Sequence, residues 1–454
     1  MATTVDRSRL DALLRTEREQ YAAARPRSRA AHKSAQQHLL SGVPMTWMAK
    51  WPGGFPMYLA TAGGNRVTDI DGHSYVDFCL GDTGAMAGHS PPATVDAVRT
   101  RIGEQGGITA MLPTEDAAWV GADLARRFGL PRWSFTLTAT DANRWAIRLA
   151  RQVTKRPKVL CFSYCYHGSV DETVIVVSDG KPVSRPGNVG AAVDPTRTTR
   201  VVEFNDVTGL EAALRHEDVA VVVAEPALTN IGIVLPDPGY LETVRRVTRE
   251  AGTLLLIDET HTFSAGWGGC TKEWSLEPDI VTIGKAIGGG VPCGAYGLTD
   301  HVAERIGAER DADLVDAGGV GGTLAGNALS VAAMRATLEH VLTPAAFRRM
   351  AELATRYADG VQHSIDEHGL AWSITRLGAR AEYRFAAPAP RSGGESAAAA
   401  DDQLDEYFHL RLANQGILLT PFHNMALMCP TTSEADVDLH TEVFAAAVAD
   451  LVGA

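Results

Sequence analysis

The sequence predicts an α/β protein whose mostly parallel β-sheet is covered by helices on both faces. Four uninterrupted apolar runs occupy residues 158–162, 219–225, 253–258 and 279–284. Segments with helical periodicity, such as residues 241–250, separate these runs. Strands that are apolar on both faces and alternate with helices are typical of a parallel sheet buried between two helical layers.

Polar or reactive side chains follow each apolar run. Tyr166 and His167 come shortly after the first run, Glu225 ends the second, Asp258 ends the third and Lys285 follows the fourth. The carboxyl ends of parallel strands meet at one edge of a sheet, which is where such folds bind their ligands. We therefore expect these five side chains to lie near one another.

The length of the chain predicts more than one domain. With 454 residues the chain exceeds what one hydrophobic core usually serves, so a large domain with a smaller companion is expected. We place N-terminal helices and part of the small domain at residues 1–77, the large domain at 78–327 and a C-terminal small domain at 328–454.

Local patterns predict several further elements. Residues 8–40 have helical periodicity and predict one or two surface helices, with Ser8 as the N-cap. The pair Asp71-Gly72 lies between two short strand patterns and predicts a hairpin turn. We expect a long helix over residues 328–340 and an exposed loop in the low-complexity stretch 387–402.

The overall composition favours a small-molecule enzyme. The 42 basic and 54 acidic residues give a formal net charge of −12 without a long basic block, which argues against a nucleic-acid or anionic-membrane surface. The six cysteines form no paired motif, so neither a disulfide framework nor a structural metal is expected. No signal peptide and no apolar run of about 18 residues is found, so we expect a cytoplasmic protein.

Lys285 is the first candidate for chemistry. It lies between an apolar strand and a glycine-rich stretch, Gly288-Gly-Gly. A lysine at a strand end can be desolvated and then forms imines with carbonyl groups, while glycines let the backbone approach a bound group closely. A plain surface lysine is the alternative.

Asp258 ends the buried strand that precedes the lysine strand. A carboxylate in such a place can pair with the pyridine nitrogen of pyridoxal 5'-phosphate (PLP) and keep that nitrogen protonated, which makes the ring a good electron sink. An Asp that merely caps a helix is the alternative.

The turn Thr138-Ala139-Thr140 runs into a helix and completes the set. Free N–H groups at a helix N-terminus bind phosphate, and two hydroxyls would add donors. A simple N-cap at Thr140 is the alternative. Together, an imine-forming lysine, a ring-pairing acid and a phosphate turn predict PLP as the cofactor.

A resemblance to a known family rests on four motifs: Asp258-Glu-Thr, Thr-Ile-Gly-Lys285-Ala-Ile-Gly-Gly-Gly, Gly322-Thr-Leu-Ala-Gly-Asn327 and Gly88-His-Ser-Pro91. They resemble those of class III aminotransferases of PLP fold type I, over residues 40–450. Residues 164–168 and 225–232 are most similar to glutamate-1-semialdehyde aminomutases and the β-amino-acid aminotransferases grouped with them. The resemblance implies a large domain with a mostly parallel seven-stranded sheet, and a smaller α+β domain from both termini.

The resemblance also implies roles for residues at the cofactor ring. Lys285 would carry PLP as a Schiff base and move a proton as general acid and base, and Asp258 would pair with the pyridine nitrogen. Tyr166 would stack on the ring, with His167 beside it. Glu225 would lie near the phenolic oxygen and the substrate entry. Tyr166 and His167 as ordinary strand-end residues, and Glu225 as a simple strand end, are the alternatives.

Further implied roles concern the rest of the cofactor. Asn230 would join Glu225 near the phenolic oxygen, while Thr138, Ala139 and Thr140 would bind the phosphate. Thr323 would reach the phosphate of the neighbouring subunit's cofactor, which implies a homodimer with shared sites. Thr323 as a mere N-cap of the following helix is the alternative.

Two departures from the family pattern affect the site. Ala139 stands where the family usually has glycine, which places a methyl group close to the phosphate. The family's Asp-Glu-Val becomes Asp258-Glu-Thr-His261, which places a hydroxyl where an apolar side chain usually supports the ring. His261 is either a proton carrier behind the site or a satisfied polar residue.

A third departure concerns the substrate. The aminomutase pattern Asn-Ser-Pro-Val-Arg, whose arginine holds the substrate carboxylate, is represented by residues 42–50, which contain no arginine. Trp47 and Met48, with Phe422 and His423, predict an aromatic and apolar pocket side. Arg384 is a candidate carboxylate clamp, or else a surface ion-pair partner.

We consider several functions. The first is an aminotransferase that moves an amino group between an amino acid or amine donor and a keto acid, aldehyde or ketone acceptor. An aminomutase, racemase or decarboxylase on the same scaffold is the alternative, and the missing arginine argues against semialdehyde chemistry. A non-catalytic interaction protein is disfavoured because folding requires neither Lys285 nor Asp258.

Overall fold

The computed structural model describes residues 3–308 and 319–453 and divides the chain into two compact units. Unit 1 comprises Met1–Ser90, Arg348–Ala389 and Ala399–Ala454, and unit 2 comprises Pro91–Phe347 and Pro390–Ala398. Unit 1 is thus built from both ends of the chain. The helix at Ala328–His340 belongs to unit 2 in this division, whereas the boundary placed at residue 327 assigned it to the small domain.

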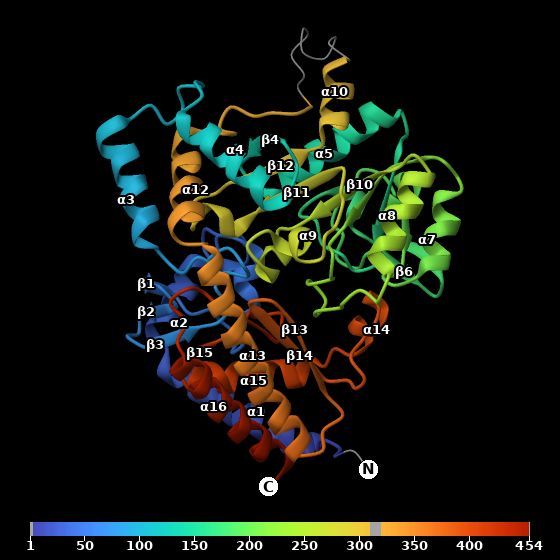
Figure 1. Ribbon diagram of the computed structural model, residues 1–454. Coiled ribbons are helices and arrows are strands. Elements are labelled where there is room, and N and C mark those ends of the chain that lie inside the picture. The colour runs from blue at the N-terminus through green and yellow to red at the C-terminus, as the bar shows by residue number, and fades with distance from the viewer. Residues whose placement is uncertain (1–2, 309–318, 454) are drawn as a thin grey trace. The chain divides into compact units, whose positions relative to one another are not determined.

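Unit 2 contains a seven-stranded sheet in the order β4-β12-β11-β10-β9-β5-β8 (Figure 1). The strands are β4 (Arg132–Thr136), β5 (Lys158–Phe162), β8 (Thr199–Val202), β9 (Val219–Ala224), β10 (Leu254–Asp258), β11 (Ile280–Gly284) and β12 (Gly294–Leu298). Only β12 runs antiparallel to its neighbours, so the sheet is mostly parallel, as predicted. The four apolar runs form β5, β9, β10 and β11, which confirms their prediction as strands.

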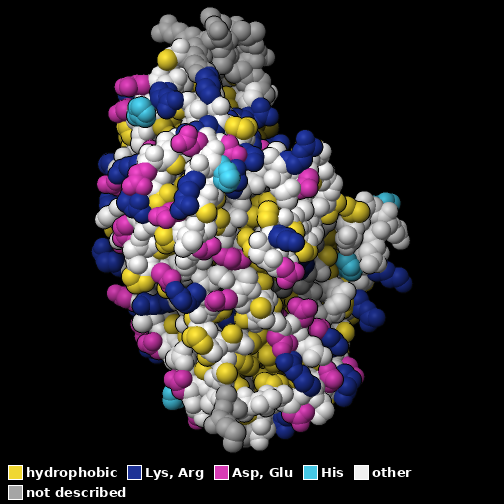
Figure 2. All heavy atoms as spheres, turned by 90° about the vertical axis from the view of Figure 1, so that its right-hand side faces the viewer, with side chains coloured by type: hydrophobic (Ala, Val, Ile, Leu, Met, Phe, Trp, Pro, Cys, Tyr) yellow, Lys and Arg dark blue, Asp and Glu magenta, His cyan; other side chains and the backbone are white. Residues whose placement is uncertain are grey.

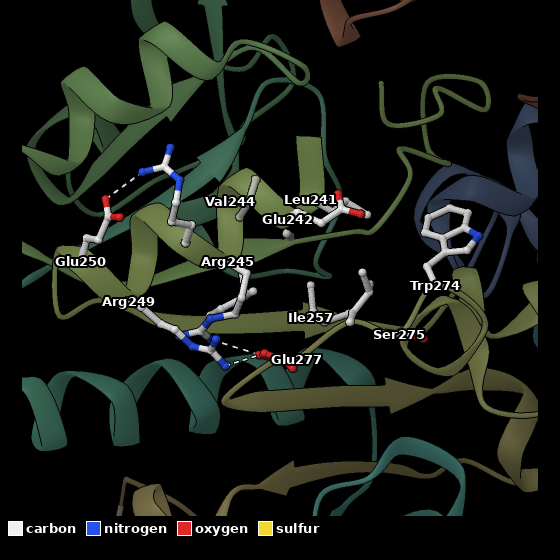
Figure 3. A pocket seen from close by; sticks show the side chains of 14 residues that line it. Leu241, Glu242, Val244, Arg245, Arg249, Glu250, Ile257, Trp274, Ser275 and Glu277 are labelled. Carbon is white, nitrogen blue, oxygen red and sulfur yellow. Dashed lines mark hydrogen bonds and ion pairs between the residues drawn. The ribbon is translucent and has the colours of Figure 1, made fainter. Parts of the chain in front are cut away.

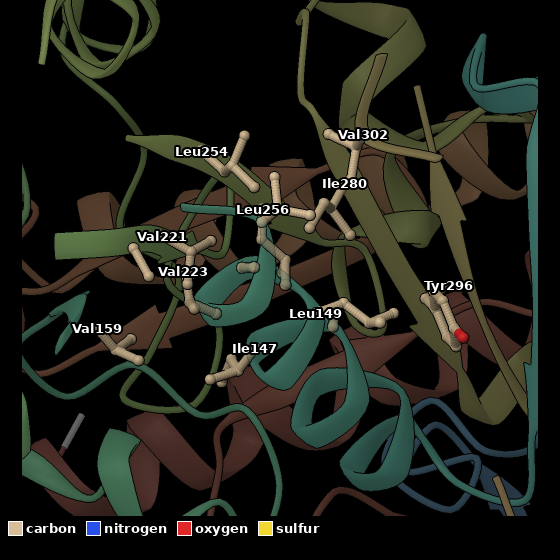
Figure 4. Close-up of a cluster of buried hydrophobic side chains, with 14 of the residues drawn as sticks. Ile147, Leu149, Val159, Val221, Val223, Leu254, Leu256, Ile280, Tyr296 and Val302 are labelled. Carbon is tan, nitrogen blue, oxygen red and sulfur yellow. The ribbon is translucent and has the colours of Figure 1, made fainter. Parts of the chain in front are cut away.

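Helices cover both faces of this sheet, because its strands are apolar on both sides. Helix α5 (Ala139–Thr154) packs against β9, β10, β11 and β12 on one face. Helix α8 (Tyr240–Glu250) packs against β10 on the other face. Leu254 and Leu256 belong to the buried cluster under α5 (Figure 4), while Leu255 and Ile257 line a cavity next to α8. This alternation follows from the two-residue period of a strand.

The remaining elements of unit 2 surround the sheet. They are α3 (Pro92–Thr100), the π-helix η3 (Arg101–Gln105), α4 (Glu115–Phe128), the 3-10 turn η4 (Asp171–Thr173), the hairpin β6 (Ile175–Ser178) and β7 (Lys181–Ser184), α6 (Pro195–Thr198), α7 (Val207–Leu214), the 3-10 turn η5 (Thr262–Ala265), α9 (Gly269–Glu273), the 3-10 turn η6 (Lys285–Gly288), α10 (Asp300–Ala308), α12 (Ala328–His340) and α14 (Gly393–Ala398). Helix α12 begins and ends at the residues predicted for it.

Unit 1 contains two small sheets and the terminal helices. One sheet has the order β1-β2-β3-β15 and the other β13-β14-β16. Their strands are β1 (Leu59–Gly63), β2 (Arg66–Asp69), β3 (Ser74–Asp77), β13 (Ser373–Leu377), β14 (Arg380–Arg384), β15 (Ile417–Leu418) and β16 (Met425–Leu427). The helices are α1 (Arg7–Ala24), α2 (Pro26–Ala35), most of α13 (Pro344–Glu367), α15 (Asp402–Asn414) and α16 (Glu434–Val452), with 3-10 turns η1 (Leu40–Gly42) and η2 (Thr46–Lys50). Strands β2 and β3 form the hairpin predicted at Asp71-Gly72.

Two local predictions are wrong. Asp6 caps α1 instead of Ser8, and its carboxylate accepts a hydrogen bond of 2.9 Å from the Ser8 N–H. Residues 387–402 are not an exposed loop of the C-terminal domain, because helix α14 forms there within unit 2. The Ser396 hydroxyl donates to the carbonyl of Ile231, and Asn205 donates to the carbonyl of Arg391 at 2.8 Å. These long-range contacts order a segment whose composition alone suggests a loop.

The surface shown in Figure 2 carries basic and acidic side chains interspersed with one another, and neither sign gathers into a broad field. Within the described residues, no helix combines the length and apolarity needed to cross a bilayer. All six cysteines are buried free thiols.

Candidate active site

The carboxyl edge of the unit 2 sheet gathers the predicted cofactor residues. Strands β5, β9, β10 and β11 run in the same direction, so the residues that follow them meet at one edge. Asp258 on β10 lies opposite Thr282 on β11, three residues before Lys285. Helix α5 begins at the same edge, since β4 also runs parallel to β11.

Asp258 is a buried carboxylate in this site, and several hydrogen bonds stabilise its charge. Its side chain is 3% exposed, and its Oδ2 accepts hydrogen bonds from Asn143 Nδ2 at 2.8 Å and from His167 Nδ1 at 2.9 Å. Its Oδ1 accepts from the Thr260 N–H at 3.0 Å. Burial alone would raise the pKa of Asp258, but these partners hold it below its ordinary value, so the carboxylate stays charged.

His167 is fixed by the same carboxylate. Burial by itself would lower the pKa of His167, yet its contacts with Cys165 and Asp258 raise that pKa well above the ordinary range. Since the pKa of Cys165 is itself raised, the thiol is neutral and the carboxylate is the cause we assign. His167 is therefore a structural partner of Asp258 and more than an ordinary strand-end residue.

Asn143 is a site residue that the sequence analysis missed. It lies on α5 with no exposed surface, donates to Asp258 and to the His167 carbonyl at 3.1 Å, and accepts from the Thr282 hydroxyl at 2.6 Å. The available signal was a polar residue between Ala142 and Ala146, on the helix face that packs against apolar strands. A polar residue on such a face needs buried partners.

Glu225 joins two loops at the end of β9. Its Oε1 accepts from the Tyr166 N–H at 3.0 Å, and its Oε2 accepts from the Thr229 hydroxyl at 2.5 Å. Burial raises the pKa of the Glu225 carboxyl above its ordinary value. This carboxyl therefore positions Tyr166, whose side chain is half-buried, and does more than end a strand.

The turn before α5 packs closely against the end of β11. Thr138, and not Thr140, is the N-cap, and its hydroxyl oxygen accepts from the Asp141 N–H at 3.1 Å. The Thr140 hydroxyl oxygen accepts from the Ser169 N–H at 3.3 Å. A Cβ added at Gly284 would lie 2.9 Å from the Ala139 methyl, so the absence of a side chain there makes room for the alanine. The methyl group of Ala139 thus lies against Gly284.

Lys285 opens η6 directly after β11 and is half-buried. Its φ of 50° lies in the left-handed region, which is unusual for a residue other than glycine and costs on the order of 1–2 kcal/mol. Its Nζ forms a hydrogen bond of 2.8 Å with Nε2 of His261. Strained backbone of this kind clusters at functional sites.

The two remaining cofactor candidates lie in loops of unit 2. Asn230 is half-buried in the loop that follows β9. Thr323 is exposed in a turn before α12. It does not cap that helix, because Asn327 is the N-cap and its Oδ1 accepts from the Ser330 N–H at 2.9 Å.

The predicted substrate-pocket residues all lie in unit 1. Trp47 and Phe422 are in edge-to-face contact, with ring centroids 5.7 Å apart, and Phe422 also contacts His423. Arg384 is 7% exposed on β14, so it is not a surface ion-pair partner. Met48 is 43% exposed. Their role in substrate binding stays a prediction.

A separate cavity of about 670 Å³ lies between α8 and the sheet (Figure 3). Apolar and charged side chains line it together, and its arginines are paired: Arg245 with Asp279 at 2.8 Å, Arg246 with Glu250 at 2.8 Å and Arg249 with Glu277 at 2.6 Å. The side chains of Lys285 and Asp258 do not line it. We therefore do not assign it to the reaction.

The residues at the sheet edge fit PLP. A buried carboxylate held in its charged form suits a protonated pyridine nitrogen, and a half-buried lysine at the end of the neighbouring strand suits the aldehyde. The 16-residue helix α5 presents its N-terminus to the same edge, which suits a phosphate. A Cβ added at Gly168 or Gly294 would fall within 2.1–2.6 Å of Thr140 or Thr138, so the backbone is closely packed around this turn.

Comparisons with known proteins identify the family. Residues 47–448 match the family described as Aminotransferase class-III. The chain is 32% identical over 430 residues to the glutamate-1-semialdehyde 2,1-aminomutase 2 of Geobacillus kaustophilus, covering 92% of this chain and 97% of the relative.

Solved structures extend the comparison. The crystal structure of a glutamate-1-semialdehyde-aminomutase from Pseudomonas aeruginosa PAO1 superposes with a TM-score of 0.96 at 47% identity, covering 98% of this chain and 99% of that one. A lysine-to-alanine variant of that protein has been solved in complex with PMP. An omega-transaminase from Sphaerobacter thermophilus has a TM-score of 0.84 at 28% identity, over 94% and 98% of the two chains.

The family match spans residues 47–448 of the 454-residue chain. The seven-stranded, mostly parallel sheet is the expected scaffold. The chain therefore belongs to the class III aminotransferases, which are PLP-dependent enzymes of fold type I.

Proposed function

We propose that this chain is an aminomutase of the semialdehyde type, which moves an amino group between neighbouring carbons of one small substrate. The observation that carries this proposal is the similarity to the Pseudomonas aminomutase along nearly the whole of both chains. The sequence analysis favoured transfer between two molecules, but the names of the relatives support the intramolecular alternative.

The bound cofactor would supply an aldehyde for the amine and a ring that accepts electrons from the carbon next to nitrogen. Lys285 Nζ would hold the cofactor and then move a proton as general acid and base. Asp258, kept charged by Asn143, His167 and the Thr260 N–H, would hold a proton on the pyridine nitrogen. Each role stays a proposal for the residue named.

Further residues would orient the cofactor. Thr138, Ala139 and Thr140 at the start of α5 would bind the phosphate, and Tyr166, positioned by Glu225, would cover the ring face. Asn230 would lie near the phenolic oxygen. These assignments follow the family resemblance of the motifs.

The proposal is tested by asking whether turnover depends on an added amino donor. An aminomutase isomerises a single amino-aldehyde substrate at a rate that does not depend on added amine or keto acid. The purified protein, reconstituted with PLP or PMP, is incubated with panels of amino aldehydes, α-amino acids, β-amino acids and simple amines, and products are identified by mass spectrometry. Turnover that requires both a donor and an acceptor would contradict the proposal.

A transaminase is the second candidate, and one specific observation favours it. Residues 42–50 contain no arginine to hold a substrate carboxylate as in the aminomutase pattern, and Trp47 contacts Phe422 there instead. In that case the same panel gives product only when a donor and a carbonyl acceptor are both present.

We also propose a homodimer with shared sites. Four apolar side chains are exposed in two segments of unit 2: Ile102 at 54%, Met111 at 80%, Leu112 at 73% and Leu324 at 44%. A cavity of about 230 Å³ is lined by residues of both segments, Thr323 among them. Met111 and Leu112 line this cavity, and exposed apolar groups of this kind are typical of a subunit interface.

A further inference from the structure

The contact between His261 and Lys285 lies outside the family pattern Asp-Glu-Val, which ends one residue before His261. A hydrogen bond of 2.8 Å joins Nζ of Lys285 to Nε2 of His261, whose side chain is 4% exposed. Imidazole is the side chain whose charge ordinarily changes near neutral pH, and it can donate or accept a hydrogen bond. The amine of the site thus has a partner that can exchange a proton with it.

The backbone around His261 holds the imidazole in place. Its carbonyl accepts from the Ser264 N–H at 3.3 Å and from the Ser264 hydroxyl at 3.1 Å. Glu259, two residues before His261, has no exposed surface and accepts from the Thr262 hydroxyl at 2.6 Å and the Thr271 hydroxyl at 2.6 Å. The turn from β10 into η5 is therefore tied to α9, and His261 does not depend on Lys285 for its position.

The backbone of Lys285 is held by a different element from that of His261. Its left-handed backbone at φ 50° starts η6, so its side chain leaves the end of β11 from a defined point. Two groups held by separate elements at hydrogen-bond distance, one amine and one imidazole, can share a proton, with one nitrogen donating and the other accepting.

We propose that His261 is a positioning residue that holds Nζ of Lys285 and couples the protonation of this amine to that of the imidazole. The inference deepens the proposed function and rests on it, because a lysine that moves a proton needs a defined place and charge whenever it is not bonded to the cofactor. His261 acts through Lys285, and its proton can pass to or from Nζ without any further reactant.

Other titratable groups lie on the elements around this pair. They are Asp258 and Glu259 on and after β10, His167 after β5, Glu225 after β9, Asp141 on α5, Cys270, Lys272 and Glu273 on α9, Cys293 before β12, and Arg335, Glu339 and His340 on α12. All of them remain when only His261 is changed. A titration step that disappears in a His261 variant therefore belongs to the His261 pair.

The first test uses cofactor-free protein, so that it is independent of activity. Lys285 is acetylated by acetic anhydride at a series of pH values, and the labelled peptide is quantified by mass spectrometry. We expect two protonation steps in the wild type and a single step in His261→Gln, which keeps a hydrogen bond but does not titrate. In His261→Phe the lost bond to the ammonium should speed labelling at neutral pH by roughly 2- to 10-fold.

The control is His440→Gln in unit 1, where His440 is fully buried and bonded to the Tyr357 hydroxyl at 3.0 Å. It should leave the two steps unchanged. A single step in the wild type, or two unchanged steps in His261→Gln, would overturn the proposal. The number of protonation steps in the wild-type acetylation profile tests the proposal even if His261→Phe does not fold.

The second test uses the PLP-loaded protein and follows the visible absorption band against pH. His261→Gln should shift the midpoint or remove one step, while His440→Gln should match the wild type. A protein that binds no PLP would refute the proposed function, yet the labelling experiment would still decide the role of His261. An identical midpoint and shape in His261→Gln and wild type would refute the coupling alone.

Discussion

The Asp258 carboxylate carries its charge in a place that is almost closed to water. Its three hydrogen-bond donors come from α5, from the loop after β5 and from the backbone after β10. An ion buried in this way stays charged only while these donors remain in place. The position of each donor thus sets how well the carboxylate can hold a proton on a bound ring.

Asp258→Asn should lower turnover by about 100- to 1000-fold, because a neutral amide no longer supplies the negative charge that the ring nitrogen requires. Initial rates at saturating PLP measure the loss. Asp279→Asn is the control, since Asp279 pairs with Arg245 ahead of β11, at the other end of that strand from Lys285. If the two variants lose turnover equally, the role given to Asp258 is wrong.

The His167–Asp258 pair also predicts how stability depends on pH. The lowered pKa of Asp258 gives stability that is present above its unfolded value of 3.8 and is lost as pH falls through the folded value. The raised pKa of His167 gives stability that is present below 6.5 and is lost as pH rises through its folded value. The pair therefore stabilises most between about pH 4 and 6.5.

Urea unfolding of the cofactor-free protein between pH 5 and 9 tests this linkage. The wild type should lose more unfolding free energy above pH 6.5 than His167→Asn, which has no group to titrate there. Parallel curves for the two proteins would show that His167 is not charged in the folded state.

At the scale of elements, the N-terminus of α5 depends on glycine in a neighbouring loop. Gly168 has φ 79°, and a Cβ there would lie 2.1 Å from the Thr140 hydroxyl oxygen and 3.0 Å from the Thr140 Cα. Gly129 has nearly the same φ, 78°, but a Cβ there would have open space around it. Comparing alanine substitutions at these two glycines therefore separates the effect of backbone strain from that of a steric clash.

Gly168→Ala should therefore weaken PLP binding roughly tenfold, because Thr140 must move and with it the phosphate turn. Gly129→Ala should leave PLP affinity unchanged and cost only the left-handed strain, on the order of 1–2 kcal/mol of unfolding free energy. Fluorescence titration gives the affinities and urea unfolding the stabilities. Equal PLP affinity in both variants would contradict the argument.

Strand β10 should be sensitive to truncation. Leu256 has no exposed surface and lies in the cluster beneath α5, so Leu256→Ala should lower the unfolding free energy by about 2–5 kcal/mol. Val189→Ala, at a side chain that is 92% exposed, should change it by less than about 0.5 kcal/mol. Urea unfolding measures both, and a loss below about 1 kcal/mol at Leu256 would contradict tight packing there.

The sequence predicts these elements better than the contacts between them. Short continuous apolar runs such as residues 219–224 favour buried strands, and the helix at 328–340 begins after an Asn cap. The Asn143–Asp258 bond joins residues 115 positions apart, and no local pattern encodes it. Helix α14 was missed for the same reason, because distant partners such as Asn205 and Ile231 order it.

Within the site, residue identities were more predictable than their partners. Lys285 and Asp258 were found because each ends an apolar run, which is a local signal. The hydrogen bond between His261 and Lys285 depends on how η5 and η6 turn after their strands, and that geometry is set by tertiary contacts such as those of Glu259.

At the scale of the whole molecule, the exposed apolar residues around Thr323 predict the oligomeric state. Leu112→Glu places a charge in this surface and should shift the dimer toward monomer, as measured by light scattering after size-exclusion chromatography. Val189→Glu is the control, because its exposed side chain lies outside the cavity that Thr323 lines. A wild type that is monomeric at micromolar concentration would refute the dimer.

Unit 1 is drawn from both ends of the chain, and this affects how the protein is made. Helix α1 packs on α15, and β3 pairs with β15, so Met1–Ser90 lacks these partners until the ribosome has passed Leu418. At about 5 to 20 residues per second, synthesis from Pro91 to Leu418 takes roughly 16 to 66 s. During it the nascent N-terminal segment exposes apolar surface to chaperones, while the almost contiguous unit 2 can fold first.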